Sequence, residues 1–251
     1  MGEVVAVLPA LNEADALPEA LDGAPAWLDI VVVDNASTDD TAAVAAALGA
    51  SVAHEPFRGY GAAVQRGLAA ADGATYIAIL DADATFDWGD LGAMLAPLRA
   101  DRADVVLGRR VRERREPGAM PWHVGMANAV LARVCGRIAG ADLHDIGPFK
   151  ALRGDVVAAV GARDRTYGWP LEFALRAADA GLRLEEVDVA YRVRAGVSKV
   201  TGRPWPTVKT AAKMLWVLLR HAGALRRRGG PDDGEPTAAP MVAPPSGADP
   251  S

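Results

Sequence analysis

Along the first 110 residues, short apolar runs alternate with Ala- and Leu-rich stretches of helical spacing. This pattern predicts a parallel sheet covered by helices on both faces. Short runs that are apolar throughout are separated by roughly 10 to 15 residues with helical spacing. The expected strands are residues 4–8, 30–33, 51–54, 76–80 and 105–107, and the expected helices are residues 14–21, 39–48, 61–71 and 91–98. This is the pattern of a doubly wound α/β domain, whose ligand site lies beyond the carboxyl ends of its strands.

The pattern changes after Arg110. A charged segment with Pro and Gly, RVRERREPGAMPW, is expected to form a solvated loop. The remaining pattern predicts a helix over about 123–139, a short strand at 149–152, helices near Val156 and over 171–180, a strand at 184–189 and a basic loop over 191–206. We expect one domain over residues 1–204, an amphipathic helix over 205–228, and a Pro-rich acidic tail over 229–251 that is too poor in apolar residues to fold. Within the domain, the change of pattern separates two expected halves, residues 1–110 and 111–204.

Charge is distributed unevenly along the chain. There are 27 Lys and Arg against 32 Asp and Glu, a net charge of −5, which argues against a nucleic-acid coat protein. The last 23 residues hold four acids and no base, so the rest of the chain is close to neutral. The segment 205–228 holds six bases and no acid. The net charge therefore conceals a basic helix that precedes the acidic tail.

The cysteine content and the N-terminus indicate a compartment. The chain has one cysteine, Cys135, and so no intrachain disulfide framework, which is typical of a reducing environment. The N-terminal apolar run has no basic residues before it and stops at Asn12 and Glu13, so we interpret it as a first strand and not as a signal peptide. No stretch reaches the length of a membrane span. We expect a cytoplasmic protein, either free or peripheral on the cytoplasmic face of a membrane.

Candidate chemistry lies at the predicted strand ends. The first strand is followed by Asn12 and Glu13, and the second ends at Asp34 and enters a helix through residues 37–39, where a hydroxyl or carboxylate can cap the helix. Capping does not account for Asp34, for which we expect a ligand role. The fourth strand is followed by Asp81 and Asp83, two carboxylates that can reach one hard cation. Mg²⁺ or Mn²⁺ held this way keeps positions open for diphosphate oxygens.

Several ordered motifs between residues 4 and 202 resemble those of the family 2 glycosyltransferases of GT-A fold. They are LPALNE, VVVDNASTDDT, RGYGAAVQRGLAAADG, LDADATF, VVLGRR, DIGPFKALR and YRVRAGVSKVTG. Within that family the chain is most similar to the dolichyl- or polyprenyl-phosphate sugar synthases, which transfer mannose or glucose. The resemblance implies a nucleotide-diphospho-sugar transferase fold and a donor of the GDP-mannose or UDP-glucose type.

The resemblance also implies that residues 1–110 are the nucleotide-sugar-binding or donor half, and that residues 111–204 are the acceptor-binding half. The nucleotide-sugar-binding positions are Pro9, Asn12, Glu13, Asp34, Ser37, Gly59, Gly61, Asp81 and Asp83. Among these, Gly59 and Gly61 lie in a turn that lets the nucleotide approach. Asp81 and Asp83 would hold Mg²⁺ or Mn²⁺ and the diphosphate, with Asp83 as the direct ligand. Family members often carry Gln where this chain has Thr85.

The resemblance also implies a set of basic residues, at positions that bind the phosphates of donor and acceptor in the polyprenyl-phosphate enzymes. They are Arg109, Arg194, Ser198 and Lys199. The arginine role in the last loop falls to Arg192 or Arg194, because that loop is one residue shorter here. Arg110, Arg112, Arg114 and Arg115 alternate with acids and are interpreted as a solvated loop.

Glu172 has two interpretations. It is the base if the acceptor is a hydroxyl, and it positions the sugar or orders the acceptor loop if the acceptor is a lipid phosphate. An acceptor phosphate is already an anion and requires cations more than a base. The resemblance thus implies a catalytic set of Asp83, Arg109, Glu172, Arg194 and Lys199.

The helix expected after Pro206 has an apolar face beside a stripe that contains Lys209, Lys213, Trp216 and Arg220. Either it packs on its own domain with a solvated basic edge, or it lies at a membrane interface. The leading hypothesis is transfer of a hexose to polyprenyl phosphate, with inversion. The alternatives are a soluble hydroxyl acceptor, nucleotidyl transfer, for which no Gly-rich basic signature follows the first strand, or a non-catalytic nucleotide-sugar binding protein.

Overall fold

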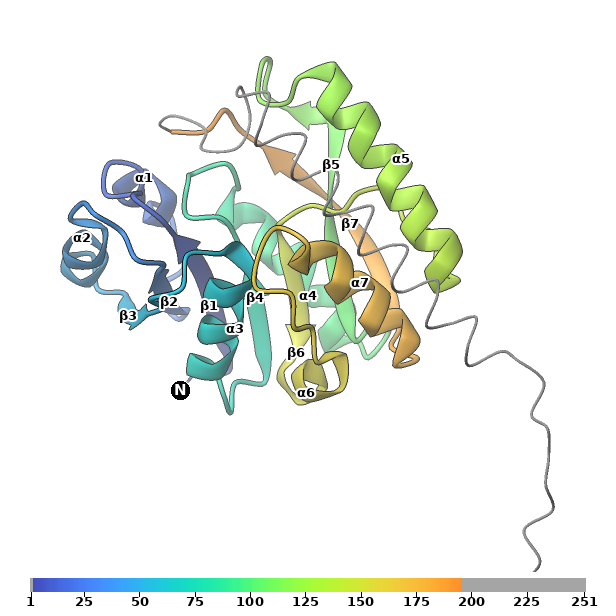
Figure 1. The fold of residues 1–251 in the computed structure, drawn as a ribbon, viewed down its shortest axis with the longest axis horizontal. Helices are drawn as coiled ribbons and strands as arrows, with labels where there is room; N and C mark the ends of the chain where they lie inside the picture. Colours follow the sequence, from blue (N-terminus) through green and yellow to red (C-terminus); the bar gives the residue numbers. More distant parts are fainter. Residues whose placement is uncertain (1, 196–251) are drawn as a thin grey trace, which may run out of the picture.

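A seven-stranded twisted sheet organises residues 2–195, the part of the chain that the computed structural model describes (Figure 1). The strand order is β3-β2-β1-β4-β6-β5-β7. Every neighbouring pair is parallel except the two that involve β6. The strands are β1 (Val4–Ala10), β2 (Asp29–Asp34), β3 (Ser51–His54), β4 (Tyr76–Ile79), β5 (Val105–Arg115), β6 (Lys150–Arg153) and β7 (Leu184–Tyr191). The predicted mostly parallel α/β sheet is confirmed.

The central strands are apolar throughout because the sheet is buried on both faces. Along β1, Val5 and Val7 enter one hydrophobic core, whereas Val4, Ala6 and Leu8 enter the other. Successive strand residues project to opposite faces, so a run of valines serves two cores at once.

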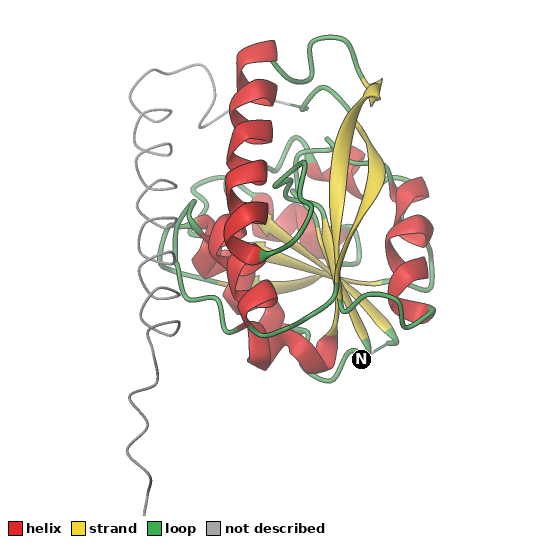
Figure 2. Cartoon of the chain, turned by 90° about the vertical axis from the view of Figure 1, so that its right-hand side faces the viewer, coloured by secondary structure: helices red, strands yellow, loops and turns green. Residues whose placement is uncertain are grey.

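Helices cover the two faces in separate groups (Figure 2). The first core is closed by α3 (Tyr60–Ala70), α5 (Trp122–Ala139), α6 (Val157–Val160) and α7 (Trp169–Asp179). The second core is closed by α1 (Leu17–Leu21), α2 (Thr41–Ala47) and α4 (Leu91–Arg99). Two short 3-10 turns, η1 (Trp88–Asp90) and η2 (Gly154–Val156), precede α4 and α6. None of the helices within residues 2–195 is long and apolar enough to cross a bilayer.

Strand β6 enters the sheet between β4 and β5 and runs antiparallel to both. Its first residue, Lys150, lies opposite Ile79 of β4 and Leu107 of β5. The short predicted strand at 149–152 is confirmed, and its direction brings the segment before it to the carboxyl end of β4 and beside the middle of β5.

The predicted loop over residues 110–122 is wrong in its first half. Strand β5 continues to Arg115, which pairs with Tyr191 of β7 after a register shift that follows Arg110. Arg114 donates to the carboxylate of Asp90 at 2.6 Å and to the carbonyl of Asp188. The charged residues therefore form a strand because β7 pairs with their backbone and nearby acids pair with their side chains.

The start of the first helix also differs from the prediction. Helix α1 begins at Leu17, with Pro18 in its first turn, and not at residue 14. Proline is favoured in the first turn of a helix because its missing N–H is not needed there.

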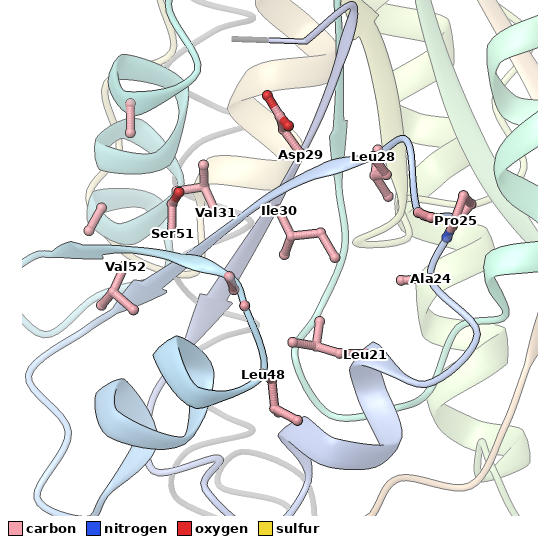
Figure 3. Close-up of a pocket in the computed structure, with 15 residues that line it drawn as sticks. Leu21, Ala24, Pro25, Leu28, Asp29, Ile30, Val31, Leu48, Ser51 and Val52 are labelled. Carbon is pink, nitrogen blue, oxygen red and sulfur yellow. The ribbon is translucent and has the colours of Figure 1, made fainter.

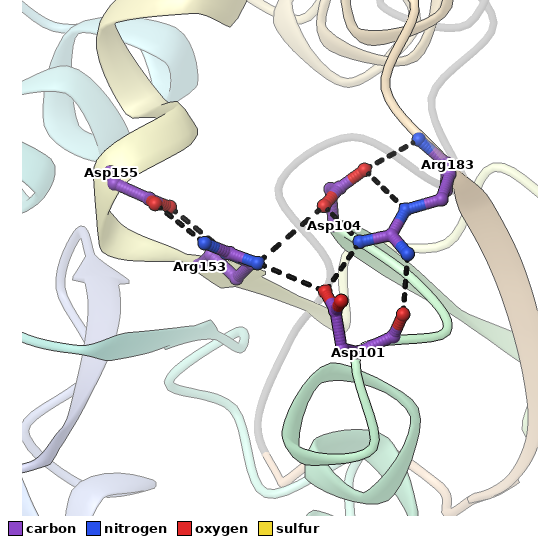
Figure 4. Close-up of polar contacts among 5 residues, drawn as sticks. All are labelled: Asp101, Asp104, Arg153, Asp155 and Arg183. Atoms are coloured by element: carbon purple, nitrogen blue, oxygen red, sulfur yellow. Dashed lines mark hydrogen bonds and ion pairs between the residues drawn. The ribbon is translucent and has the colours of Figure 1, made fainter.

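An ion-pair cluster lies at the edge of the sheet where β5 and β7 begin (Figure 4). Arg183, just before β7, pairs with Asp101 at 2.7 Å and with Asp104 at 2.8 Å. Arg153, at the end of β6, pairs with Asp101 and Asp155. The cluster connects the amino ends of β5 and β7 to the carboxyl end of the antiparallel β6.

Candidate active site

The carboxyl ends of β1, β2 and β4 lie side by side. Ala10 is the register partner of Asp34, and the amide of Leu80 donates to the carbonyl of Val7 at 3.1 Å. The segments that follow these strands therefore leave the same edge of the sheet, and they carry most of the predicted donor-site residues. This is the edge at which doubly wound sheets bind ligands.

The loops after β1 and β2 are locked to each other. The amide of Asn12 donates to Ser37 Oγ at 3.0 Å, and Asn12 Oδ1 accepts from the amide of Thr38 at 2.7 Å. Asn12 has a φ of 51°, in the left-handed region that asparagine tolerates. The amide of Glu13 donates to Thr41 Oγ1 at 2.9 Å. Pro9 lies half-buried just before this junction.

The predicted N-cap within residues 37–39 is wrong, because the N-cap residue of helix α2 is Asp40, whose side chain makes no capping hydrogen bond. Helix α2 begins at Thr41, and Asp39 Oδ1 accepts from its amide at 3.1 Å. Ser37 Oγ instead joins the two loops. Its hydroxyl has that role because the helix starts four residues farther along the chain.

Asp34 is held as a carboxylate. Its oxygens accept from the amide of Ser37 at 3.0 Å and contact His54 Nδ1 at 3.2 Å. Burial acts to raise the pKa of Asp34, but the hydrogen bonds from Ser37 and His54 outweigh it and lower the pKa below its usual value. Asp34 therefore offers an ionised acceptor at the end of β2.

Gly59 and Gly61 are required by a close approach of protein backbone. A Cβ on Gly59 would lie 2.1 Å from the carbonyl oxygen of Arg165, and one on Gly61 would lie 1.9 Å from that of Asp164. The amides of Gly61 and Ala62 donate to the carbonyls of Thr166 and Arg165. In the described residues, these two glycines thus seat the segment 164–166 against the start of α3.

Glu172 anchors that same segment. Its Oε2 accepts from the amides of Arg163, at 3.0 Å, and Asp164, and its Oε1 accepts from Arg176 Nε at 2.7 Å. Of the two interpretations of Glu172, this geometry corresponds to the one in which the residue orders a loop.

Asp81 and Asp83 follow β4, and Asp83 is almost fully buried. Asp83 Oδ1 accepts from Thr85 Oγ1 at 2.6 Å, and its Oδ2 accepts from Arg194 Nε at 2.6 Å. Thr85, at the position where family members often have Gln, thus supports the carboxylate of Asp83. Burial and the charge of Asp83 raise the pKa of Asp81 to about 7, while Arg194, Lys150 and Arg110 act in the opposite direction.

The structure distinguishes the two arginines of the last loop. Arg194 lies against Asp83, whereas Arg192 pairs with the exposed Asp87 outside the acid pair. The backbone of this loop also binds here, because the amide of Ala195 donates to the carbonyl of Asp83 at 3.1 Å. Ser198 and Lys199, together with the predicted helix 205–228 and tail 229–251, lie outside the described residues.

Arg109 and Arg110 differ in their surroundings. Arg109 forms an ion pair of 2.6 Å with Asp188 at the partly exposed β7 edge. Arg110 is buried, makes a two-pronged pair with Asp145, and is close enough to act on the charge of Asp81. Strand alternation explains the difference, since neighbouring residues of β5 project to opposite sides. The interpretation of Arg110 as a solvated loop residue is therefore wrong.

Two further residues of this site were not predicted. Lys150 is fully buried, and its ammonium donates to the carbonyl of Gly147. Burial lowers the pKa of Lys150 to about 7, although Asp81 acts to raise it. Asn35 is also buried and bridges the end of β2 to the turn before α3, donating to the carbonyl of Phe57 and accepting from the amide of Gly59. In the sequence, both residues could have been found from their positions, since Asn35 directly follows a predicted strand and Lys150 lies within an apolar one.

The acid pair suits a divalent cation. The described residues contain no group of three or more His, Cys, Asp or Glu side chains placed to hold a metal ion. A divalent cation at this edge of the sheet would therefore depend on ligand oxygens in addition to the carboxylates of Asp81 and Asp83. Asp81 accepts no hydrogen bond within residues 2–195. Mg²⁺ commonly binds through one or two carboxylates together with phosphate oxygens.

A separate cavity of about 480 Å³ lies at the amino ends of β2 and β3 (Figure 3). Leu21, Leu28, Ile30, Leu48 and Val52 contribute to its lining. It lies at the opposite edge of the sheet from the acid pair, and no Lys, Arg or His is among the described residues that line it.

Comparison with known proteins gives a consistent family. The family model described as Glycosyl transferase family 2 matches residues 5–158. An uncharacterized glycosyltransferase of Mycobacterium tuberculosis is 43% identical over 203 residues, which cover 79% of this chain and 90% of that protein. A dolichyl-phosphate hexose transferase of Haloferax volcanii is 30% identical over 203 residues, covering 79% and 86% of the two chains.

A solved structure shares the fold. Glucosyl-3-phosphoglycerate synthase from Mycobacterium tuberculosis, crystallised with Mn²⁺, uridine diphosphate and phosphoglyceric acid, superposes with a TM-score of 0.69 at 22% identity. The alignment covers 88% of this chain and 79% of that one. The expected GT-A fold is confirmed.

Proposed function

The chain belongs to glycosyltransferase family 2, and on that premise we propose that it transfers a hexose from a nucleotide diphosphate sugar to a polyprenyl phosphate with the help of Mg²⁺ or Mn²⁺. The observation that carries this proposal is the acid pair Asp81 and Asp83, set at the carboxyl edge of the sheet and facing Arg194. It combines a place for a cation with a basic group for phosphate oxygens.

The donor would lie along the ends of β1 and β2. Asp34 supplies an ionised acceptor for the nucleoside, and the interlocked loops at Asn12 and Ser37 form a rigid edge beside it. Asp81 and Asp83 would hold the divalent cation, which neutralises the leaving diphosphate when bound. The Mn²⁺ and uridine diphosphate found with the structural neighbour are consistent with such a donor.

Arg194 would move between two partners. In the described structure its guanidinium supplies the positive charge that faces Asp83. If a cation occupied the acid pair, the same guanidinium would be free to hold phosphate oxygens, for which its planar fork is suited. Ser198 and Lys199, four and five residues farther on, remain proposed partners of the acceptor phosphate.

A phosphate acceptor is favoured by the state of Glu172. A hydroxyl acceptor requires a base that can take its proton. The carboxylate of Glu172 already accepts from two backbone amides and from Arg176. An acceptor that is already an anion does not require such a base. The lipid part of the proposal is supported by the dolichyl-phosphate hexose transferase relative.

A second candidate is a small phosphorylated acceptor. The name of the structural neighbour, glucosyl-3-phosphoglycerate synthase, gives this class of acceptor its chemistry. It uses the same donor and the same cations around the acceptor phosphate, and differs in the absence of a lipid chain.

A panel of donors and acceptors tests both. Labelled UDP-glucose and GDP-mannose are incubated with the full chain, Mg²⁺ or Mn²⁺, and polyprenyl phosphate, unphosphorylated polyprenol or phosphoglycerate. We expect label in the organic phase with polyprenyl phosphate and none with polyprenol. Label only in a water-soluble product would move the assignment to the second candidate, and transfer to polyprenol would contradict the phosphate requirement.

A further inference from the structure

Tyr60 carries a hydroxyl that has no hydrogen-bond partner among residues 2–195. It is the first residue of α3, between Gly59 and Gly61. Its hydroxyl oxygen is shielded from water and makes no hydrogen bond within residues 2–195. A buried polar group without a partner costs free energy, so a phenylalanine would serve better here if packing were the only role.

The surroundings of Tyr60 lead to the acid pair. Its ring packs edge-on against Trp169 of α7, with ring centroids 6.3 Å apart, and the buried indole N–H of Trp169 also has no partner among the described residues. Both rings lie on the face of the sheet that receives Ile77 and Ile79 of β4. By strand alternation, Asp81 continues that row. Tyr60 and Asp81 therefore lie on the same side of the sheet at its carboxyl edge.

The hydroxyl of Tyr60 is a donor. Burial raises the pKa of Tyr60 well above its usual value, and the charges of Asp81 and Asp83 raise it further. Within residues 2–195, the Tyr60 hydroxyl has no acceptor and the Asp81 carboxylate has no hydrogen-bond donor, and both lie on the same side of the sheet. One bound ligand could therefore interact with both groups.

We propose that the Tyr60 hydroxyl donates a hydrogen bond to an oxygen of the diphosphate-sugar portion of the bound donor, beside the cation held by Asp81 and Asp83. The inference rests on the proposed function and adds a donor-binding residue to it. Seated between two glycines that let the segment 164–166 approach, the ring is fixed before the ligand arrives. The ligand oxygen enters when Arg194 leaves Asp83, so Tyr60 gains its partner only in the loaded site.

The test compares Tyr60→Phe with Tyr76→Phe in the full chain. Tyr76 begins β4 at the opposite edge of the sheet, where Arg99 lies over its ring. The dissociation constants of UDP-glucose and GDP-mannose are measured by calorimetry with Mn²⁺, together with the melting temperature of the ligand-free proteins. We expect Y60F to weaken donor binding roughly tenfold, as for the loss of a hydrogen bond to a charged group, with no loss of thermal stability. Y76F should leave donor binding unchanged.

The possible results are distinct. Donor binding by Y60F equal to that of the natural protein overturns the role of Tyr60, and so does a lower melting temperature of the ligand-free variant, which would mean that the hydroxyl has a structural partner such as a buried water. If the natural protein itself binds neither nucleotide sugar, the proposed function fails first and the role of Tyr60 fails with it.

Discussion

At the residue scale, the carboxylate of Asp83 divides its oxygens between two donors of different kinds. Thr85 is a neighbour two residues along the chain, and Arg194 arrives from 111 residues away. The first bond fixes the orientation of the carboxylate, whereas the second supplies a charge that can be exchanged for another cation. Arg194 therefore marks the position that a divalent ion would compete for.

Asp83→Asn tests the importance of that charge. The amide keeps the size of the side chain but loses the negative charge that holds a cation. We expect kcat/KM to fall roughly 100- to 1,000-fold, the effect of removing one preorganised electrostatic group. The measurement is metal-dependent transfer of labelled hexose. The matched control is Asp87→Asn, a partly exposed acid that pairs with Arg192 and caps η1. Equal activity of D83N and D87N would contradict the role of Asp83.

Gly61→Ala tests the close approach between α3 and the segment 164–166. The new methyl group would meet the carbonyl oxygen of Asp164 and push the segment away, so we expect a loss of about 1–3 kcal/mol in the free energy of unfolding, as for overpacking. Gly92→Ala in α4 is the control, since its Cβ would meet nothing within 4 Å and alanine favours a helix. Urea unfolding of both variants should give changes of opposite sign.

At the element scale, the segment 163–166 connects the start of α3 to the first turn of α7. Its carbonyls accept from the first amides of α3, and its own amides donate to Glu172 of α7. The start of one helix and the first turn of another are thus connected through a loop, which places Tyr60 and Trp169 in contact.

Glu172→Gln separates an anchoring carboxylate from a catalytic base. An amide oxygen can still accept from the backbone, so we expect turnover to fall less than about tenfold, below the 100-fold or more that the loss of a general base causes. The pH profile of kcat should keep its shape, because no titrating base is removed. A collapse of turnover with loss of one limb of the profile would instead identify Glu172 as the base.

Local periodicity predicted most elements but not their partners. The apolar runs at β1 and β4 are visible in the sequence because both faces of those strands are buried. The continuation of β5 through Arg114 and Arg115 was not predictable, since its support comes from Tyr191 and Asp90 in distant parts of the chain. For the same reason, the resemblance implied Asp83 and either Arg192 or Arg194, but it could not show that Arg110 is the buried arginine paired with Asp145 while Arg109 pairs with Asp188.

At the scale of the whole molecule, the ion-pair cluster of Arg153 and Arg183 with Asp101, Asp104 and Asp155 links three strands at the edge opposite the site (Figure 4). The hydrogen bond from Arg183 lowers the pKa of Asp104 to about 2, against the opposing effect of burial. The folded protein therefore holds Asp104 ionised more strongly than the unfolded chain does.

This linkage predicts an acid-dependent loss of stability. The contribution of Asp104 is complete above the pKa of the unfolded chain, near 4, and is lost as the pH falls toward 2. After allowance for solvent screening we expect about 1 kcal/mol. Asp104→Asn should thus be less stable than the natural protein at pH 6 and equally stable near pH 2, as measured by urea unfolding. A difference that stays constant across this range would contradict the linkage.

The placement of β6 has a consequence for how the chain can fold. During synthesis, β4 is complete at residue 79, but the strand that pairs with its second edge ends at Arg153, and the segment that seats against Gly61 follows at 164–166. The first 110 residues therefore emerge from the ribosome with an unpaired apolar strand edge, which is prone to aggregation. We infer that the donor half is not an independent folding unit, and that sheet closure waits for residues from the acceptor half.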